Sequence, residues 1–262
     1  MAPSSDSFPL GYIYSLPPRP KTRSLGDHLA EHITDNGRIT TLIDAICSTP
    51  NPALWSPDLN RPPIDHATIK RFMSSFILPS TRAPLGPNDR VMMALPTGPE
   101  NALALLSVAA YHTCAPVNAS CTAGELRDDA VRLRAKAVVT TRDAAERLEV
   151  ASLYHEENME IIFVENRTSG PAGLFDMSMF GQQGLASTKG RRPSQPHGLE
   201  HQSLVLHTSG TSGKKKVVPY SLRHLIVGTS CVVQSWDLRP ESVNSESLWL
   251  DALHLPRLLT SP

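Results

Sequence analysis

A short run of hydroxyl residues, glycines and lysines is the part of this sequence best suited to chemistry. It reads Thr-Ser-Gly-Thr-Ser-Gly-Lys-Lys-Lys over residues 208–216 and lies between two apolar segments. Glycines let a backbone approach a ligand closely and adopt positive φ, and successive backbone N–H groups form a nest that binds anions. The hydroxyls add donors, and a lysine adds a point charge suited to phosphate. The run therefore predicts a phosphate-binding loop.

This loop differs from the Walker P-loop. That motif has four residues between its glycines and a Ser or Thr directly after the lysine. Here two residues separate Gly210 from Gly213, and Lys214 is followed by Lys215. Taken alone, the run also fits a Ser/Gly linker with a basic end.

The segments around the loop are expected to alternate between strands and helices. Apolar and β-branched runs predict strands at residues 40–46, 90–95, 114–118, 136–140 and 159–165, with another opening at 204–206. Helical spacing predicts helices at 25–33, from an N-cap at Asp65 to Pro79, and at 98–112, 122–133, 142–155 and 221–235. Residues 166–200 are rich in Gly, Ser, Pro and Gln and predict a long surface loop. This order favours an α/β fold with a mostly parallel sheet and flanking helices.

Helix starts carry the clearest local signals. Thr122 and Glu125 form a capping box, in which the hydroxyl and the carboxylate each satisfy a free backbone N–H. Glu100 falls in the first turn of its helix, where the helix dipole favours a carboxylate. Four charged residues of the helix after Thr122 are interpreted as a solvated face: Asp128, Asp129, Arg132 and Arg134.

Composition argues against several function classes. Lys plus Arg number 25, as do Asp plus Glu, so neither nucleic acid nor an anionic membrane surface is an expected partner. No apolar run is long enough to span a bilayer, and the Pro/Ser-rich N-terminus lacks the apolar core of a signal peptide. The four cysteines form no CxxC pair, which favours free thiols in a reducing compartment. We therefore expect a cytoplasmic protein.

A zinc site is a weaker possibility in the N-terminal region. His28-Leu-Ala-Glu-His32 fits the H-x-x-E-H pattern of inverted zinc peptidases. A polar helix face explains the same residues, and the sequence places no third ligand nearby. The favoured interpretation is therefore that the protein has no metal ligands of its own.

The loop resembles the phosphate-binding signature of the adenylate-forming superfamily. This group comprises acyl-CoA synthetases, luciferases and the adenylation domains of nonribosomal peptide synthetases. Its pattern is an aromatic residue, Thr-Ser-Gly-Thr-Thr-Gly, any residue, then Pro-Lys-Gly. The chain matches it at Thr208, Ser209, Gly210, Thr211, Gly213 and Lys216. It departs with His207 at the aromatic position, Ser212 for Thr, Lys215 for Pro and Val217 for Gly.

The resemblance extends upstream over roughly residues 40–240. The family's early segment has a Gly-Asp-Arg-Val strand, a helix, a Pro-(Val/Leu)-Asn turn, a Thr…Glu-Leu helix and an Ala-Lys strand, in that order. The matching residues here are Asp89-Arg90-Val91, Pro116-Val117-Asn118, Thr122, Glu125-Leu126 and Ala135-Lys136. The combined order makes the resemblance far more specific than the loop alone.

What the resemblance implies is activation of a carboxylic acid by MgATP, giving an acyl-adenylate and pyrophosphate. A thiol of coenzyme A or of a carrier protein's phosphopantetheine then accepts the acyl group. By this resemblance, the ATP phosphates are bound by Thr208, Ser209, Gly210, Thr211, Ser212, Gly213 and Lys216, and Mg²⁺ neutralises their charge. The implied partners are the acid, ATP and, in some members, a carrier protein. No residue is assigned as catalytic.

The family's later motifs have no match in this sequence. They are the aromatic-His segment, the adenine-binding Tyr-Gly-x-Thr-Glu, the ribose-binding Thr-Gly-Asp, the hinge, and the mobile domain with its catalytic lysine. We therefore expect a flexible lead at 1–24, a partial AMP-binding domain at 25–240 and an unrelated tail at 241–262. The chain is interpreted as the N-terminal half of such a ligase, ended by a truncation, a frameshift or alternative splicing. Such a half is either an inactive fragment or one part of a split protein that acts with a missing second half.

Two other interpretations stay open. The alternatives are a non-catalytic remnant or interaction protein that keeps the half-fold, and a fragment of an adenylation domain of the nonribosomal peptide synthetase type. ATP-dependent pyrophosphate exchange distinguishes an enzyme from a non-catalytic remnant.

Overall fold

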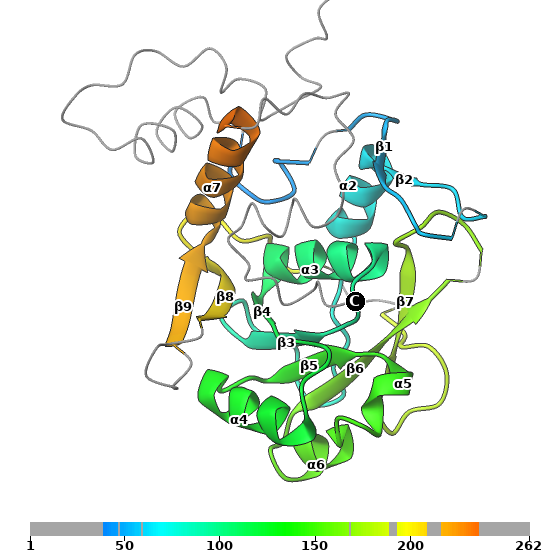
Figure 1. Ribbon diagram of the computed structural model, residues 1–262, viewed down its shortest axis with the longest axis vertical. Helices are drawn as coiled ribbons and strands as arrows, with labels where there is room; N and C mark the ends of the chain where they lie inside the picture. The colour runs from blue at the N-terminus through cyan, green and yellow to red at the C-terminus, as the bar shows by residue number, and fades with distance from the viewer. Residues whose placement is uncertain are drawn as a thin grey trace, which may run out of the picture.

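A seven-stranded sheet forms the centre of the protein (Figure 1). The computed structural model describes residues 39–46, 48–58, 60–167, 169–188, 193–208 and 216–235. The strands are β3 (Arg90–Ala94), β4 (Thr113–Pro116), β5 (Ala137–Thr140), β6 (Glu160–Asn166), β7 (Phe175–Met179), β8 (Gln202–Thr208) and β9 (Lys216–Ser221). Their order across the sheet is β7-β6-β5-β3-β4-β8-β9.

The five inner strands are parallel and the two outer ones are antiparallel to their neighbours. Strands β6, β5, β3, β4 and β8 run in one direction. Strand β7 pairs antiparallel with β6, and β9 pairs antiparallel with β8. The expected mostly parallel α/β sheet is therefore confirmed.

Helices cover both faces of this sheet. The helices are α2 (His66–Ser74), α3 (Pro99–Tyr111), α4 (Ala123–Leu133), α5 (Arg142–Ala145), α6 (Val150–His155) and α7 (Leu222–Ser235). Figure 1 shows α2 and α3 on one face and α4, α5 and α6 on the other, with α7 continuing from β9. A small antiparallel pair, β1 (Pro52–Leu54) and β2 (Ile64–Asp65), lies beside α2.

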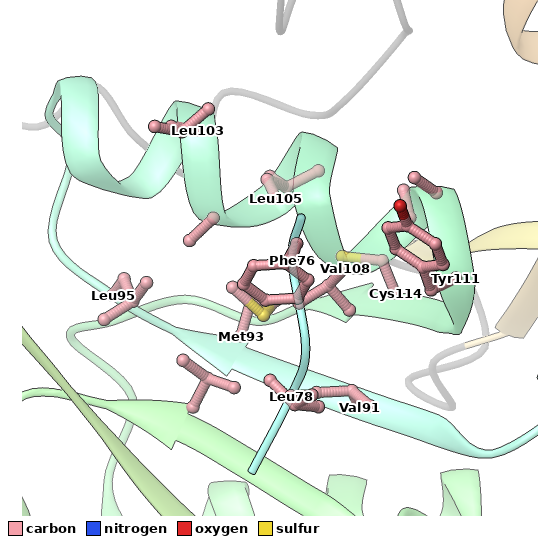
Figure 2. Packing of buried hydrophobic residues seen from close by; sticks show 14 of the residues in the cluster. Phe76, Leu78, Val91, Met93, Leu95, Leu103, Leu105, Val108, Tyr111 and Cys114 are labelled. Carbon is pink, nitrogen blue, oxygen red and sulfur yellow. The ribbon is translucent and has the colours of Figure 1, made fainter. Parts of the chain in front are cut away.

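Strand β3 shows why the core has two layers. Val91 and Met93 belong to the buried cluster on the α3 side, together with Leu103 and Val108 of that helix (Figure 2). The alternate residues of β3, including Met92, belong to a second cluster with α4. Successive side chains of a strand point to opposite faces, so a strand covered on both sides is apolar throughout. The continuous apolar run at 91–95 follows directly from this position.

The predicted caps of α2 and α4 are confirmed. The Asp65 carboxylate accepts a hydrogen bond from the Thr68 N–H at 2.6 Å. At α4 the Thr122 hydroxyl accepts from the Glu125 N–H, and the Glu125 carboxylate accepts from the Thr122 N–H. Both satisfy backbone donors that the first turn of a helix leaves free.

The strand predicted at 40–46 is wrong, because these residues form turns. The Asp44 carboxylate accepts hydrogen bonds from the N–H and hydroxyl groups of Thr40 and Thr41, at 2.8 to 3.1 Å. Such short polar side chains offer the backbone an alternative to a sheet ladder. The local Thr-Thr…Asp pattern therefore outweighs the apolar residues that follow it.

Two predicted helices are shorter than expected. The helix beginning at Asp65 ends at Ser74 instead of continuing to Pro79, although Phe76 beyond it is still buried. The single helix predicted at 142–155 is two helices, α5 and α6. Glu149 between them adopts a left-handed conformation with φ of 49°, which an α-helix cannot include.

The long surface loop predicted at 166–200 is also partly wrong. Strand β7 lies within it and pairs with β6 over five residues. Phe175 and Met179 are buried in the α3-side cluster, so β7 extends the core at that edge. Because Gly- and Ser-rich segments lie on either side of β7, the sequence pattern did not indicate this short strand. The predicted N-terminal lead at 1–24, the helix at 25–33 and the tail at 241–262 lie outside the described residues.

Candidate functional site

The candidate phosphate-binding loop connects β8 to β9, and the two strands form a hairpin. Their antiparallel register pairs His207 with Val217 and Thr208 with Lys216. Residues Ser209, Gly210, Thr211, Ser212 and Gly213 lie outside the described residues, as do Lys214 and Lys215. Thr208 therefore ends one strand and Lys216, which is exposed, begins the next.

This connection lies at the edge of the sheet where ligands bind in α/β proteins. Because β3, β4, β5 and β8 are parallel, their carboxyl ends meet at one edge. The chain leaves β3 toward α3 on one face, and it leaves β4 toward α4 on the other (Figure 1). Open α/β sheets bind ligands at such an edge, near the point where successive helices change face.

The residues of the upstream motif have structural roles here. The Asp89 carboxylate accepts from the Gly86 N–H at 2.7 Å, which closes the turn before β3. The Arg90 guanidinium donates to the Leu133 carbonyl at 2.9 Å and so anchors the end of α4. The Asn118 side chain accepts from the Ser120 N–H at 2.9 Å in the turn after β4. Asp89 and Arg90 thus stabilise the amino end of β3, whereas Asn118 shapes a turn after the carboxyl end of β4.

Asp129 corrects the interpretation of α4 as carrying a wholly solvated charged face. Asp128, Arg132 and Arg134 are exposed, as expected, but Asp129 is only 4% exposed. Its Oδ2 atom lies 3.6 Å from Nδ1 of His207, and its Oδ1 atom lies 3.4 Å from the Arg132 guanidinium. An acidic side chain of α4 thus faces the residue that precedes the candidate loop.

A part-buried ion pair at the start of α3 was not predicted from the sequence. The Glu100 carboxylate accepts from the Arg61 guanidinium at 2.6 Å and from the Gly173 N–H at 3.1 Å. The same guanidinium donates to the Pro171 carbonyl at 3.1 Å. Glu100 thus joins the β3–α3 turn to two distant segments. The position of Glu100 in the first helical turn indicated that a carboxylate is favoured there, but it did not indicate these partners.

Two buried histidines lie on the α3 side near the start of β8. His112 lies with Nδ1 2.9 Å from the Gly86 carbonyl oxygen. Burial lowers the pKa of His112, although the Gly86 hydrogen bond and the Asp89 charge oppose this. The ring of His197 stacks on that of His201 with centroids 4.9 Å apart. Burial, followed by repulsion from His201 and His112, lowers the pKa of His197 to about 4.

A buried carboxylate closes the opposite end of the sheet. Glu160 is 3% exposed at the start of β6 and accepts hydrogen bonds from Ser80, Thr81 and the Arg82 N–H. Burial acts to raise the pKa of Glu160, but the hydrogen bonds from Ser80, Arg82 and Thr81 outweigh it and the pKa is lowered. This site lies at the amino end of a parallel strand, so its role is structural.

The described residues show no group of three or more His, Cys, Asp or Glu side chains that could hold a metal ion. The histidines of the possible zinc pattern, His28 and His32, lie outside them. Among the described residues, Cys114 and Cys231 are free thiols. None of the helices described there has the length and apolar character that crossing a membrane requires.

A family model described as "AMP-binding enzyme" matches residues 81–253. The match begins before β3 and includes the β8–β9 hairpin and α7. No curated protein matches the chain.

Several solved structures are similar in part. Apo MatB from Rhodopseudomonas palustris is 18% identical with a TM-score of 0.47, over 60% of this chain and 29% of that one. Its ATP-bound form is 20% identical with a TM-score of 0.48, over 65% and 33%. The NpsA N-terminal subdomain from Klebsiella oxytoca, in complex with 3-hydroxybenzoyl-AMSN, is 15% identical with a TM-score of 0.36, over 55% and 31%. The chain therefore spans less than a third of the length of the first of these structures.

Proposed function

Because this chain belongs to the family of AMP-binding enzymes, we propose that it takes part in ATP-dependent activation of a carboxylic acid. In this reaction a carboxylate oxygen attacks the α-phosphorus of ATP. The bond from that phosphorus to the bridging oxygen breaks, and pyrophosphate leaves with the electron pair. A thiol, either of coenzyme A or of a phosphopantetheine on a carrier protein, then takes the acyl group and AMP is released.

The observation that carries this proposal is the β8–β9 hairpin within the matched family region. Its connection has the donors for a phosphate group and begins at the carboxyl end of a parallel strand. Lys216 is exposed at the mouth of the hairpin, opposite Thr208 in the register. This placement fits a triphosphate, which needs backbone donors and a cation close together.

We assign phosphate binding to the following residues: Thr208, Ser209, Gly210, Thr211, Ser212, Gly213 and Lys216. In this assignment the hydroxyls and backbone N–H groups of the loop orient the phosphates, and Lys216 offsets their charge. Such positioning and charge stabilisation account for most of the protein's part in a phosphate displacement. When bound, Mg²⁺ would supply further neutralisation of the phosphate oxygens.

Binding of MgATP and ATP–pyrophosphate exchange test the proposal in the full chain. Exchange should depend on an added carboxylic acid, drawn from a panel of aromatic, aliphatic and dicarboxylic acids. Lys216→Met should weaken MgATP binding at least about tenfold, because a hydrogen bond to a charged group contributes roughly 1.5–3 kcal/mol. Lys136→Met is the matched control, since Lys136 is exposed at the start of a different strand.

Each outcome has a definite meaning. Acid-dependent exchange that Lys216→Met reduces and Lys136→Met leaves unchanged supports the proposal. MgATP binding without exchange supports the phosphate site but not acid activation by this chain. A folded protein that neither binds MgATP nor catalyses exchange would refute the proposal and favour a non-catalytic interaction protein.

A further inference from the structure

His197 is a buried histidine whose ring has no hydrogen-bond partner at either nitrogen. The residue is 2% exposed, and both Nδ1 and Nε2 are shielded from water. A neutral imidazole carries one donor and one acceptor, and unpaired polar groups are costly in a protein interior. In a folded protein such a group is explained by strain, by a functional role, or by a bound water or ion. The residues around the ring favour an ion.

A second histidine lies against this ring. His201 follows in the same short segment, and a turn closed by the His201 N–H and the Gly198 carbonyl at 3.1 Å brings the two side chains together. Their ring centroids are 4.9 Å apart and their planes differ by 14°. Two imidazoles on one tetrahedral zinc ion have centroids about 5 Å apart, because each Zn–N distance is about 2.0–2.1 Å. The observed separation therefore fits a shared metal ion.

Only one of the two rings has to move to bind an ion jointly. The rings lie nearly parallel, and a shared ion requires one nitrogen of each ring to face it. His201 is exposed, and an exposed side chain changes rotamer readily without moving the backbone. The buried His197 is held in place, since its backbone N–H donates to the Ala110 carbonyl at 2.7 Å. One ligand is thus fixed, and the other gives access from solvent.

Zinc binds the neutral form of imidazole, and the surroundings of His197 keep its ring neutral. Burial, followed by repulsion from His201 and His112, lowers the pKa of His197 to about 4. The carbonyl groups of Pro87 and Tyr111 act in the opposite direction, but neither forms a hydrogen bond of normal geometry with the ring. At neutral pH no proton has to leave His197 before a metal binds, which removes one cost of coordination.

We propose that His197 and His201 form a binding site for a divalent cation of the zinc type, with water completing the coordination. Imidazole nitrogen suits Zn²⁺, Cu²⁺ and Ni²⁺, whereas Mg²⁺ and Ca²⁺ prefer oxygen ligands. A site with two protein ligands agrees with the finding that the described residues contain no larger group of metal-ligating side chains.

The position of this site determines what a bound ion does. Both histidines precede β8, so they lie at the opposite end of that strand from the candidate phosphate-binding loop. The His197 N–H contacts the end of α3, and the His201 carbonyl accepts from the Leu222 N–H at the start of α7 at 3.0 Å. A bound ion therefore fastens the turn of residues 197–201 between α3 and α7 and stabilises the folded state.

Zinc binding by the metal-stripped full chain tests the proposal, measured by competition with a chromogenic chelator. The midpoint of thermal unfolding should rise by at least about 5 °C when free Zn²⁺ is about a hundred times its dissociation constant. Mg²⁺ at the same concentration should give no rise. Zn²⁺ should also shift the ring nitrogen-15 signals of His197 and His201 together, because one ion contacts both.

Substitutions at the exposed histidine keep the test independent of the buried one. His201→Gln should weaken zinc binding at least about tenfold, since losing even a residue that supports a metal ligand costs about 10–100-fold. His201→Cys supplies another zinc ligand and should restore binding. His155→Gln is the matched control, because His155 is also exposed, and it should bind like wild type. Thermal unfolding without metal shows whether each variant folds.

The H-x-x-E-H pattern at His28 and His32 is the main competing zinc site. The double substitution His28→Gln/His32→Gln should leave the zinc affinity and the signals of His197 unchanged. Loss of zinc binding in this variant would overturn the proposal and assign the ion to the N-terminal pattern. Zinc binding that His201→Gln leaves unchanged, or an unfolding midpoint that Zn²⁺ does not raise, would overturn it as well. None of these measurements uses ATP, so their outcome is independent of the proposed function.

Discussion

Lowering the pH from 6.5 to 5 should destabilise the protein through His197. This side chain is 2% exposed, and burial, followed by repulsion from His201 and His112, lowers its pKa to about 4. In the unfolded chain the ring binds a proton near its ordinary value of about 6.5. Between these two values the unfolded state binds more protons than the folded state, so stability is fully present above pH 6.5 and is lost as the pH falls toward 4.

The size of this effect follows from the same two values. The full difference corresponds to about 3 kcal/mol, reached below pH 4, and the loss at pH 5 is about 2 kcal/mol. The lowered pKa of His112 acts in the same direction and adds to the slope. Glu160 affects stability only at more acidic pH. Because its pKa is lowered, its contribution to the free energy of unfolding is lost only as the pH falls below the ordinary Glu pKa near 4.5. The window from pH 6.5 to 5 therefore reports on the histidines.

Urea unfolding at several pH values between 7 and 5 measures the effect as the slope of unfolding free energy against pH. His197→Gln should reduce that slope, whatever its effect on stability at pH 7, and leave the smaller part due to His112. His155→Gln is the matched control, since His155 is exposed at the end of α6. A wild-type slope near zero, or an equal slope in His197→Gln, would refute the assignment of a buried neutral imidazole.

Further substitutions test the contacts that stabilise the helices and strands around the sheet. Thr122→Ala removes the capping box of α4 and should cost about 1 kcal/mol of unfolding free energy, measured by urea unfolding. Glu160→Gln should lower the free energy of unfolding by roughly 1–3 kcal/mol at pH 7, because the donors of residues 80–82 lose a charged acceptor. This difference from wild type should vanish as the pH falls below about 4.5 and the wild-type carboxylate becomes protonated. Arg61→Gln should lower the free energy of unfolding by about 2 kcal/mol. In a double-mutant cycle with Glu100→Gln the two losses should be non-additive, since the two side chains form one ion pair. Additive losses would contradict that pairing.

The sequence alone predicted those features that depend on neighbouring residues. The caps at Asp65 and Thr122 need only a side chain and a backbone N–H three residues away, so their residue types identify them. The continuous apolar run of β3 indicated a strand covered on both faces, as the two core layers show. The strand–helix order then led to a mostly parallel sheet, and the loop signature led to the family.

The sequence predictions failed where a distant segment decided the outcome. The strand β7 has only five residues and becomes stable by pairing with β6; its own residues, flanked by Gly and Ser, did not indicate it. The Arg61–Glu100 pair joins residues 39 positions apart, and no local pattern relates them. In each case the missing information was a contact partner, not a propensity.

Asp129 shows most clearly which properties of a residue the sequence determines and which depend on tertiary structure. The sequence by itself determined that it lies on a helix, that charged residues surround it, and that a phosphate-binding type of loop follows a strand further along the chain. Only the tertiary structure decided that α4 turns this carboxylate inward against His207, because the packing of α4 on the sheet determines which side of the helix is removed from water. Charge is a property of the residue, but its burial and its partner depend on what the fold places beside it.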